Sequence, residues 1–170
     1  MPTSDQLVPP VLVLGLGNVL LGDDGVGPAL LQAVQTMYAG VSAVECIDGG
    51  TLGMALLGYL AGREALIILD AFACGEDAGT VSVLEGAELL GCGVTRSATA
   101  HEGNAGELLA AAQLLDELPA RIFLVGIEPE RVRTEIGLSE SVASAIPAAL
   151  ERTCGVVERV LAELKGHKVA

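Results

Sequence analysis

Aromatic residues are the scarcest class in this chain of 170 residues, which has two tyrosines, two phenylalanines and no tryptophan. Apolar residues nevertheless make up 51% of the chain, so its core must be built from alanine, valine, leucine and isoleucine, as buried parallel sheets usually are. No apolar run approaches the ~20 residues that a membrane helix requires. We therefore expect a soluble protein with no membrane insertion.

Basic clusters, export signals and paired cysteines are also missing. The net charge is −13 and no basic patch exceeds two residues, which disfavours binding to nucleic acid. The first ten residues lack the positive start and the apolar stretch of an export signal, so we expect a cytoplasmic protein. No Cys-x-x-Cys pair occurs among Cys46, Cys74, Cys92 and Cys154, which indicates neither a zinc cluster nor a disulfide framework.

The most informative stretch covers residues 11–28. Four consecutive apolar residues, 11–14, predict a strand that is covered on both faces. Glycines then interrupt the run in a turn that carries Asp23 and Asp24, and a helical pattern begins near Pro28. In an open α/β sheet such a loop lies at the carboxyl end of its strand, where these folds bind ligands.

This glycine loop matches a dinucleotide-binding fingerprint only in part. Gly15 and Gly17 provide the first two glycines of that spacing, but the third position is Leu20. Asp23 and Asp24 also stand where a phosphate would bind, and their charge would repel it. A nucleotide-binding α/β module is therefore a disfavoured alternative.

The rest of the chain alternates between strand and helix patterns. Further strands are predicted at residues 43–47, 65–69, 80–84 and 121–127, and helices at residues 28–38, 52–62, 106–116 and 139–165. Parallel strands joined by helices are expected, except that residues 71–79 are too few for a helical crossover, which makes the fourth strand antiparallel. The sequence thus predicts a single α/β domain over residues 1–170 with a five-stranded mixed, mostly parallel sheet.

Four local features complete this prediction. Residues 1–10 and 166–170 are expected to be flexible tails, and residues 86–101 a loop that leads to His101. Ser139 is expected to cap the last helical region, and Pro147 to kink or split it.

Three of the predicted strands are followed by aspartates, namely Asp24, Asp48 and Asp70. Parallel strands end at one edge of their sheet, so these side chains are expected close together. For each aspartate alone, the polar loop that follows a strand is the better explanation. Three carboxylates together, without a lysine or arginine nearby in sequence, would repel one another unless they were protonated or bound to a cation. We therefore predict a metal site.

The third ligand would be a histidine. His167 lies in a terminal Gly-His-Lys segment and receives no role, whereas His101 is either an incidental loop residue or a ligand. With Asp24 and Asp70 it would form a mixed oxygen and nitrogen set that suits nickel, zinc or cobalt and leaves positions open for substrate or water. No Gly-x-Ser-x-Gly elbow occurs, and a Cys74 nucleophile with His101 as its base remains an alternative.

The order and spacing of these motifs resemble the hydrogenase maturation protease family over about residues 11–164. The resemblance is carried by the glycine loop of residues 14–27, Asp48-Gly-Gly-Thr51, Asp70-Ala71, His101-Glu102 and Gly126-Ile-Glu-Pro129. It implies a three-layer α/β/α sandwich. It also implies an endopeptidase that removes a C-terminal extension from the precursor of the large subunit of a nickel-iron hydrogenase, once nickel has been inserted.

By this resemblance the nickel ligands and catalytic residues are Asp24, Asp70 and His101, and the supporting turn falls on Asp48, Gly49, Gly50 and Thr51. Some relatives carry glutamate where this chain has the shorter Asp24. Our hypothesis is that the three side chains offer ligands to nickel that the substrate already holds, which makes cleavage conditional on metal loading. Asp23 is expected to favour the start of the helix. The alternative is a nickel-delivery protein that uses the same ligands without cutting anything.

Overall fold

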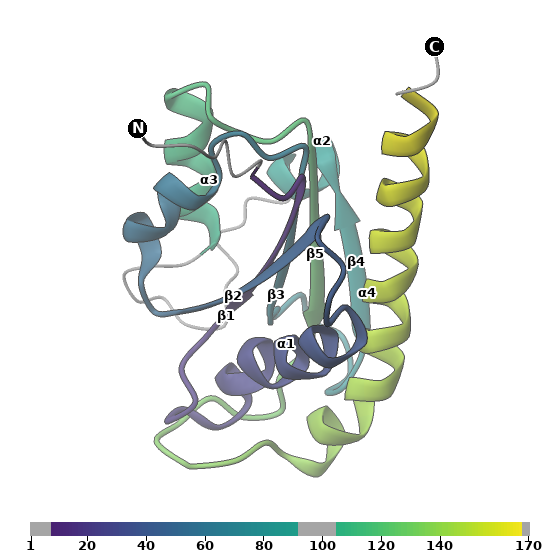
Figure 1. Cartoon of the computed structure of the whole chain (residues 1–170). Coiled ribbons are helices and arrows are strands. Elements are labelled where there is room, and N and C mark those ends of the chain that lie inside the picture. Colours follow the sequence, from purple (N-terminus) through teal and green to yellow (C-terminus); the bar gives the residue numbers. More distant parts are fainter. Residues whose placement is uncertain (1–7, 92–104, 168–170) are drawn as a thin grey trace, which may run out of the picture.

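The computed structural model describes residues 8–91 and 105–167 of the chain (Figure 1). Its strands are β1 (Val11–Leu16), β2 (Val44–Gly50), β3 (Ala65–Ala71), β4 (Val81–Glu85) and β5 (Arg121–Ile127). They form a five-stranded sheet in the order β2-β1-β3-β5-β4, in which β4 runs antiparallel to β5 and the other pairs are parallel. The predicted mixed sheet and its antiparallel fourth strand are confirmed.

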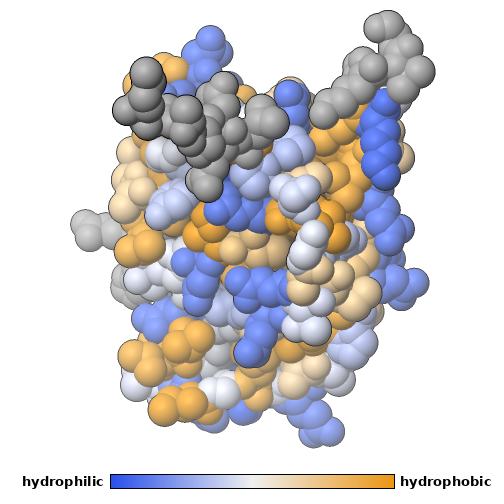
Figure 2. Space-filling view, in the orientation of Figure 1, coloured by the Kyte–Doolittle hydropathy of each residue, from blue (hydrophilic) through white to orange (hydrophobic). Residues whose placement is uncertain are grey.

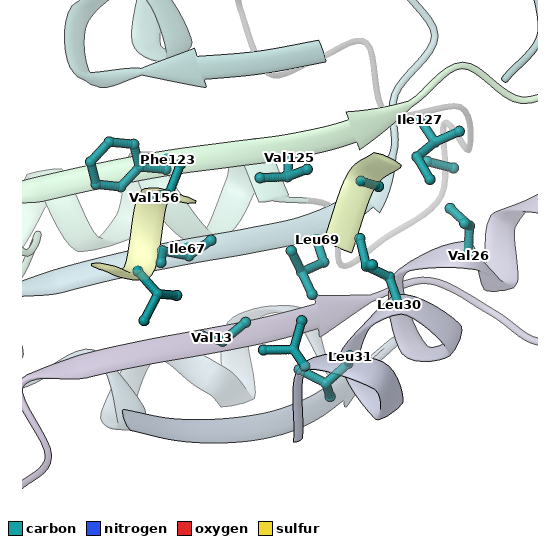
Figure 3. Packing of buried hydrophobic residues seen from close by; sticks show 14 of the residues in the cluster. Val13, Val26, Leu30, Leu31, Ile67, Leu69, Phe123, Val125, Ile127 and Val156 are labelled. Carbon is teal, nitrogen blue, oxygen red and sulfur yellow. The ribbon is translucent and has the colours of Figure 1, made fainter. Parts of the chain in front are cut away.

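Helices cover both faces of the sheet. They are α1 (Val26–Met37), α2 (Gly86–Gly91), α3 (Ala105–Leu114) and α4 (Glu140–His167), with the 3-10 segments η1 (Gly22–Gly25) and η2 (Gly53–Tyr59). Buried residues of α1 and α4 pack on one face, and those of η2, α2 and α3 pack on the other. Figure 3 shows the first of these cores, in which Val13, Ile67 and Phe123 of the sheet lie with Leu30 of α1 and Val156 of α4. The architecture is the expected α/β/α sandwich.

Three expected elements differ in detail. Residues 52–62 form the shorter 3-10 segment η2, which begins at Gly53 in a left-handed conformation (φ 51°). The expected loop of residues 86–101 begins with helix α2, because Leu89 is buried in the core under it. Pro147 does not split the last helix: α4 continues through it for 28 residues, held by the side chains that it buries against the sheet. Among the described residues no helix combines the length and the apolar character of a membrane span.

Residues near both ends of the chain take part in the fold. The carbonyl oxygen of Pro10 accepts hydrogen bonds from the N–H groups of Glu64 and Ala65, so residues next to β1 are tied to the sheet. At the other end, Gly166 and His167 belong to the last turn of α4.

Gly27 brings the first turn of α1 against the ends of the two central strands. A Cβ atom on this residue would lie 2.0 Å from the carbonyl oxygen of Leu16 and 2.5 Å from that of Leu69. Gly17 has a φ of 128°, and a Cβ there would lie 1.9 Å from the carbonyl oxygen of Asp24. These two contacts fold the glycine loop, residues 17–25, back over the carboxyl ends of β1 and β3.

Candidate functional site

Asp24 lies in the 3-10 turn η1, directly before α1, and is buried with 3% of its surface exposed. Its Oδ2 accepts a hydrogen bond of 2.7 Å from the backbone N–H of Asn18. The folded-back glycine loop therefore holds the Asp24 side chain in the interior, near the edge of the sheet where β1 ends.

Asp70 reaches the same edge from the neighbouring strand β3, since β1 and β3 pair in parallel. Its Oδ1 accepts a 2.8 Å hydrogen bond from the N–H of Ala71, and 6% of the residue is exposed. Burial and then the negative charge of Asp24 raise the pKa of Asp70 well above its usual range, against the smaller opposite effect of the Ala71 hydrogen bond. The two carboxylates thus interact directly through their charges.

This carboxylate pair fits a cation. Two buried oxygen donors that repel each other lose that repulsion when a divalent ion binds between them, and carboxylates with an added imidazole suit nickel. Within residues 8–91 and 105–167 no group of three or more potential metal-binding side chains is formed. His101, the predicted third ligand, lies outside the described residues, so the described part of the chain brings together two of the three.

Asp48 lies near the end of β2 but behaves as a turn residue rather than a ligand. The side chain is exposed, and its Oδ1 accepts a 3.0 Å hydrogen bond from the N–H of Gly50, which has a φ of 45°. Gly49 is buried, and a Cβ on it would lie 2.8 Å from Leu16 Cδ2. Residues 48–51 thus form a tight turn in which Thr51 is exposed, and their supporting role stays a prediction.

The sequence suggested that Asp23 favours the start of α1. In the structure its carboxylate instead binds the loop between β5 and α4. This fully buried carboxylate accepts hydrogen bonds from the N–H groups of Glu130 and Arg131, both 2.9 Å. It also accepts from the N–H and the hydroxyl of Ser139, at 2.6 and 2.9 Å. Burial alone would raise the pKa of Asp23, but these hydrogen bonds outweigh it and leave the pKa below its usual range.

Backbone pairing joins the same two loops. The N–H of Gly22 donates to the carbonyl oxygen of Glu135 at 2.7 Å, and the N–H of Glu135 donates to that of Leu20 at 3.0 Å. Ser139 in turn starts α4 as predicted, since its Oγ accepts from the N–H of Val142 at 3.3 Å. The loop that carries Asp24 is therefore held in place from the far end of the chain.

Glu128 is a buried acid at this edge for which the sequence assigned no role. Its Oε2 accepts hydrogen bonds from the backbone N–H and the thiol of Cys74 and from the N–H of Glu76, at 2.8, 3.2 and 3.3 Å. It directly follows β5, so the rule that placed Asp70 at this edge also places Glu128 there, but that rule does not reveal its partners. Burial and the neighbouring Glu128 raise the pKa of Cys74, which opposes its use as a nucleophile.

Comparisons with known proteins agree with this fold. The family model of the HycI hydrogenase maturation protease matches residues 28–156. The hydrogenase 2 maturation protease of Escherichia coli K12 is 38% identical over 143 residues, which cover 84% of this chain and 87% of that protein. The hydrogenase expression/formation protein HupD of Rhizobium leguminosarum is 32% identical over 92% of this chain and 78% of its own length.

A solved structure shows the same arrangement. The hydrogenase maturating endopeptidase HybD from E. coli superimposes with a TM-score of 0.77 and 34% sequence identity, over 88% of this chain and 93% of HybD. Together, the match of the family model to most of the chain and the closeness of these relatives show that this chain belongs to the hydrogenase maturation protease family.

Proposed function

We propose that this protein is a nickel-dependent endopeptidase that removes the C-terminal extension from the precursor of the large subunit of a nickel-iron hydrogenase. The observation that carries the proposal is the buried pair of Asp24 and Asp70, which repel each other at the ligand-binding edge of a maturation-protease fold. A buried pair of like charges costs stability unless a proton or a cation accompanies it.

In this proposal the nickel ion belongs to the substrate. The precursor presents the ion, and Asp24, Asp70 and His101 complete its coordination from the protease side. When bound, the metal supplies Lewis-acid chemistry, which polarises the carbonyl of the scissile peptide bond or activates a water molecule. The hydrogen bond from Asn18 to Asp24 and that from Ala71 to Asp70 fix one oxygen of each carboxylate and so hold both side chains in place.

Nickel dependence is supported by the electrostatics of the pair. A precursor without nickel would bring its own groups against two buried acids that already repel each other, and it would bring nothing to neutralise them. A loaded precursor brings the compensating charge. The site therefore favours the nickel-loaded precursor through the attraction between the two acids and the ion. The same attraction would also orient the scissile bond.

Hydrolysis without a protein nucleophile is supported by the state of Cys74. Its thiol donates to the Glu128 carboxylate and its pKa is raised by burial and by that acid, so little thiolate forms at neutral pH. The alternative of thiol catalysis by Cys74 is not needed once the precursor carries its metal. This leaves the metal-bound region of the substrate as the place where the reaction is activated.

The test is intact-mass spectrometry of a large-subunit precursor, nickel-loaded or nickel-free, after incubation with the purified protein. We expect a C-terminal peptide to be lost from the loaded precursor only. Asp24→Asn, Asp70→Asn and His101→Ala should each abolish that loss while the melting curve shows a folded protein. Asp116→Asn is the matched control, because asparagine tolerates the left-handed conformation of Asp116 (φ 57°) far from the site.

The same experiment distinguishes cleavage from metal delivery. If no loaded precursor is cut and nickel is recovered on this protein, the proposal is wrong and the protein delivers metal instead.

A further inference from the structure

We propose that a groove along α1 binds an extended segment of the precursor next to the peptide bond that is cleaved. The groove has a volume of about 350 Å³. It lies between the exposed Val19 of the glycine loop and Asp48 at the end of β2, over Gly25, Ala29, Gln32 and Gln35. This inference rests on the proposed function, because it names how the substrate of that function is held.

One end of the groove is formed by the loop that carries Asp24. Gly25 directly follows Asp24, and Val19 directly follows Asn18, whose N–H binds the Asp24 carboxylate. From Gly25 to Gln35 the helical rise of about 1.5 Å per residue gives a length of about 15 Å. An extended chain advances about 3.3 Å per residue, so the groove has room for about four residues of substrate leading away from the site.

The chemistry of α1 suits a peptide backbone. The helix carries no charged residue, although the chain as a whole has a net charge of −13. Its exposed surface instead presents the amides of Gln32 and Gln35, which have no hydrogen-bond partner within the described residues. Each amide offers both a donor and an acceptor, as a peptide bond does. Neutral amides are also easier to desolvate than charged side chains, so they suit a surface that becomes covered.

An apolar wall lies beside these amides. Val19 is 55% exposed and neighbours Leu20, which is 56% exposed, on a loop held rigidly by the Glu135 pairing and the Asp23 carboxylate. Figure 2 shows hydrophobic atoms gathered at the lower left, over the position of the glycine loop in Figure 1, next to polar atoms over α1. A segment in the groove would thus pair its backbone with the glutamines and place alternate side chains against the valine and leucine.

The proposal is tested on two quantities, the affinity of the nickel-loaded precursor by biolayer interferometry and the steady-state kinetics of its cleavage. We expect the double variant Gln32→Ala/Gln35→Ala to weaken binding and raise KM by about tenfold, because each amide contributes hydrogen bonds worth several-fold in affinity. The value of kcat should stay within about twofold, since contacts remote from the reacting bond hold substrate and transition state alike. Gln32→Trp, which fills the groove, should weaken binding further.

Gln113→Ala makes the same chemical change on the exposed surface of α3, on the other side of the sheet, and should leave affinity, KM and kcat unchanged. Melting temperatures of all variants confirm that exposed helix positions were altered without unfolding. If the wild type cleaves the precursor and the double variant binds it as tightly, the groove is not the binding site although the function holds. If the wild type binds but does not cleave, the proposed function fails, and the loss of affinity in the double variant still decides on the groove. Sedimentation that shows a dimer, dissociated by the double variant, would assign the groove to a second copy and overturn the proposal.

Discussion

Replacing Asp23 by asparagine should destabilise the fold by about 3 kcal/mol. The carboxylate accepts four hydrogen bonds, three at Oδ2 from Glu130, Arg131 and the Ser139 hydroxyl, and one at Oδ1 from the Ser139 N–H. The asparagine oxygen can keep the three at Oδ2, but its NH₂ group then faces the buried N–H of Ser139. An unsatisfied buried N–H costs about 1–3 kcal/mol, and the remaining bonds lose the strengthening that the charge gave them.

The assay is urea unfolding of the wild type and Asp23→Asn at pH 7 and at pH 3. Since hydrogen bonding holds the pKa of Asp23 below its usual range, its contribution is complete above the unfolded-state pKa of about 4 and is lost as the pH falls through the lower folded-state value. The difference between the two proteins should therefore be full at pH 7 and smaller at pH 3. Asp48→Asn, at an exposed aspartate that accepts one local hydrogen bond, should change stability by less than about 0.5 kcal/mol. If Asp23→Asn lowered the free energy of unfolding by less than about 0.5 kcal/mol at pH 7, these four hydrogen bonds would not hold the two loops together as argued.

Three further predictions follow from contacts described above. Gly27→Ala should destabilise the fold by more than about 3 kcal/mol or prevent folding, because the new Cβ would lie 2.0 Å from a strand carbonyl oxygen. Gly155→Ala in α4, where a Cβ meets nothing within 4 Å, should instead stabilise the fold by about 0.5–1 kcal/mol. Urea unfolding of both variants measures the difference. Asp70→Asn should raise the melting temperature of the metal-free protein, because burial and then the charge of Asp24 disfavour the ionised Asp70 and raise its pKa, while the change abolishes processing; a lower melting temperature would contradict this cost of the buried acid. Cys74→Ser should keep the rate of precursor cleavage measured by mass spectrometry, and loss of all activity would restore thiol catalysis.

The sheet was predictable because its signals are local. Buried strands are continuous apolar runs, and the short connection of residues 71–79 forces β4 to run antiparallel. The positions of Asp24 and Asp70 followed from the rule that parallel strands end at one edge. Both predictions needed only the order of the elements along the chain.

The roles of Asp23 and Glu128 were not predictable in the same way. Asp23 precedes a helix, and its sequence neighbours suggest a helix-start residue, yet its partners lie more than 100 residues away. Glu128 looks like an ordinary loop acid until the N–H groups of Cys74 and Glu76 are seen to converge on it. Such convergence depends on how loops distant in sequence fold against each other, and no local sequence pattern predicts that. Helix α4 likewise continues through Pro147, because tertiary packing outweighs the one backbone hydrogen bond that proline removes.

The contact between Asp23 and Ser139, which are 116 positions apart, also fixes when the site can form. Contacts between distant residues form late in folding, because a long loop must close before they contribute. During synthesis the glycine loop is made among the first residues, but the hydrogen bonds between Asp23 and Ser139 cannot form until Ser139 has left the ribosome. A nascent chain therefore lacks the finished candidate site, and the loop that carries Asp24 is fixed only after the segment that contains Ser139 has been made.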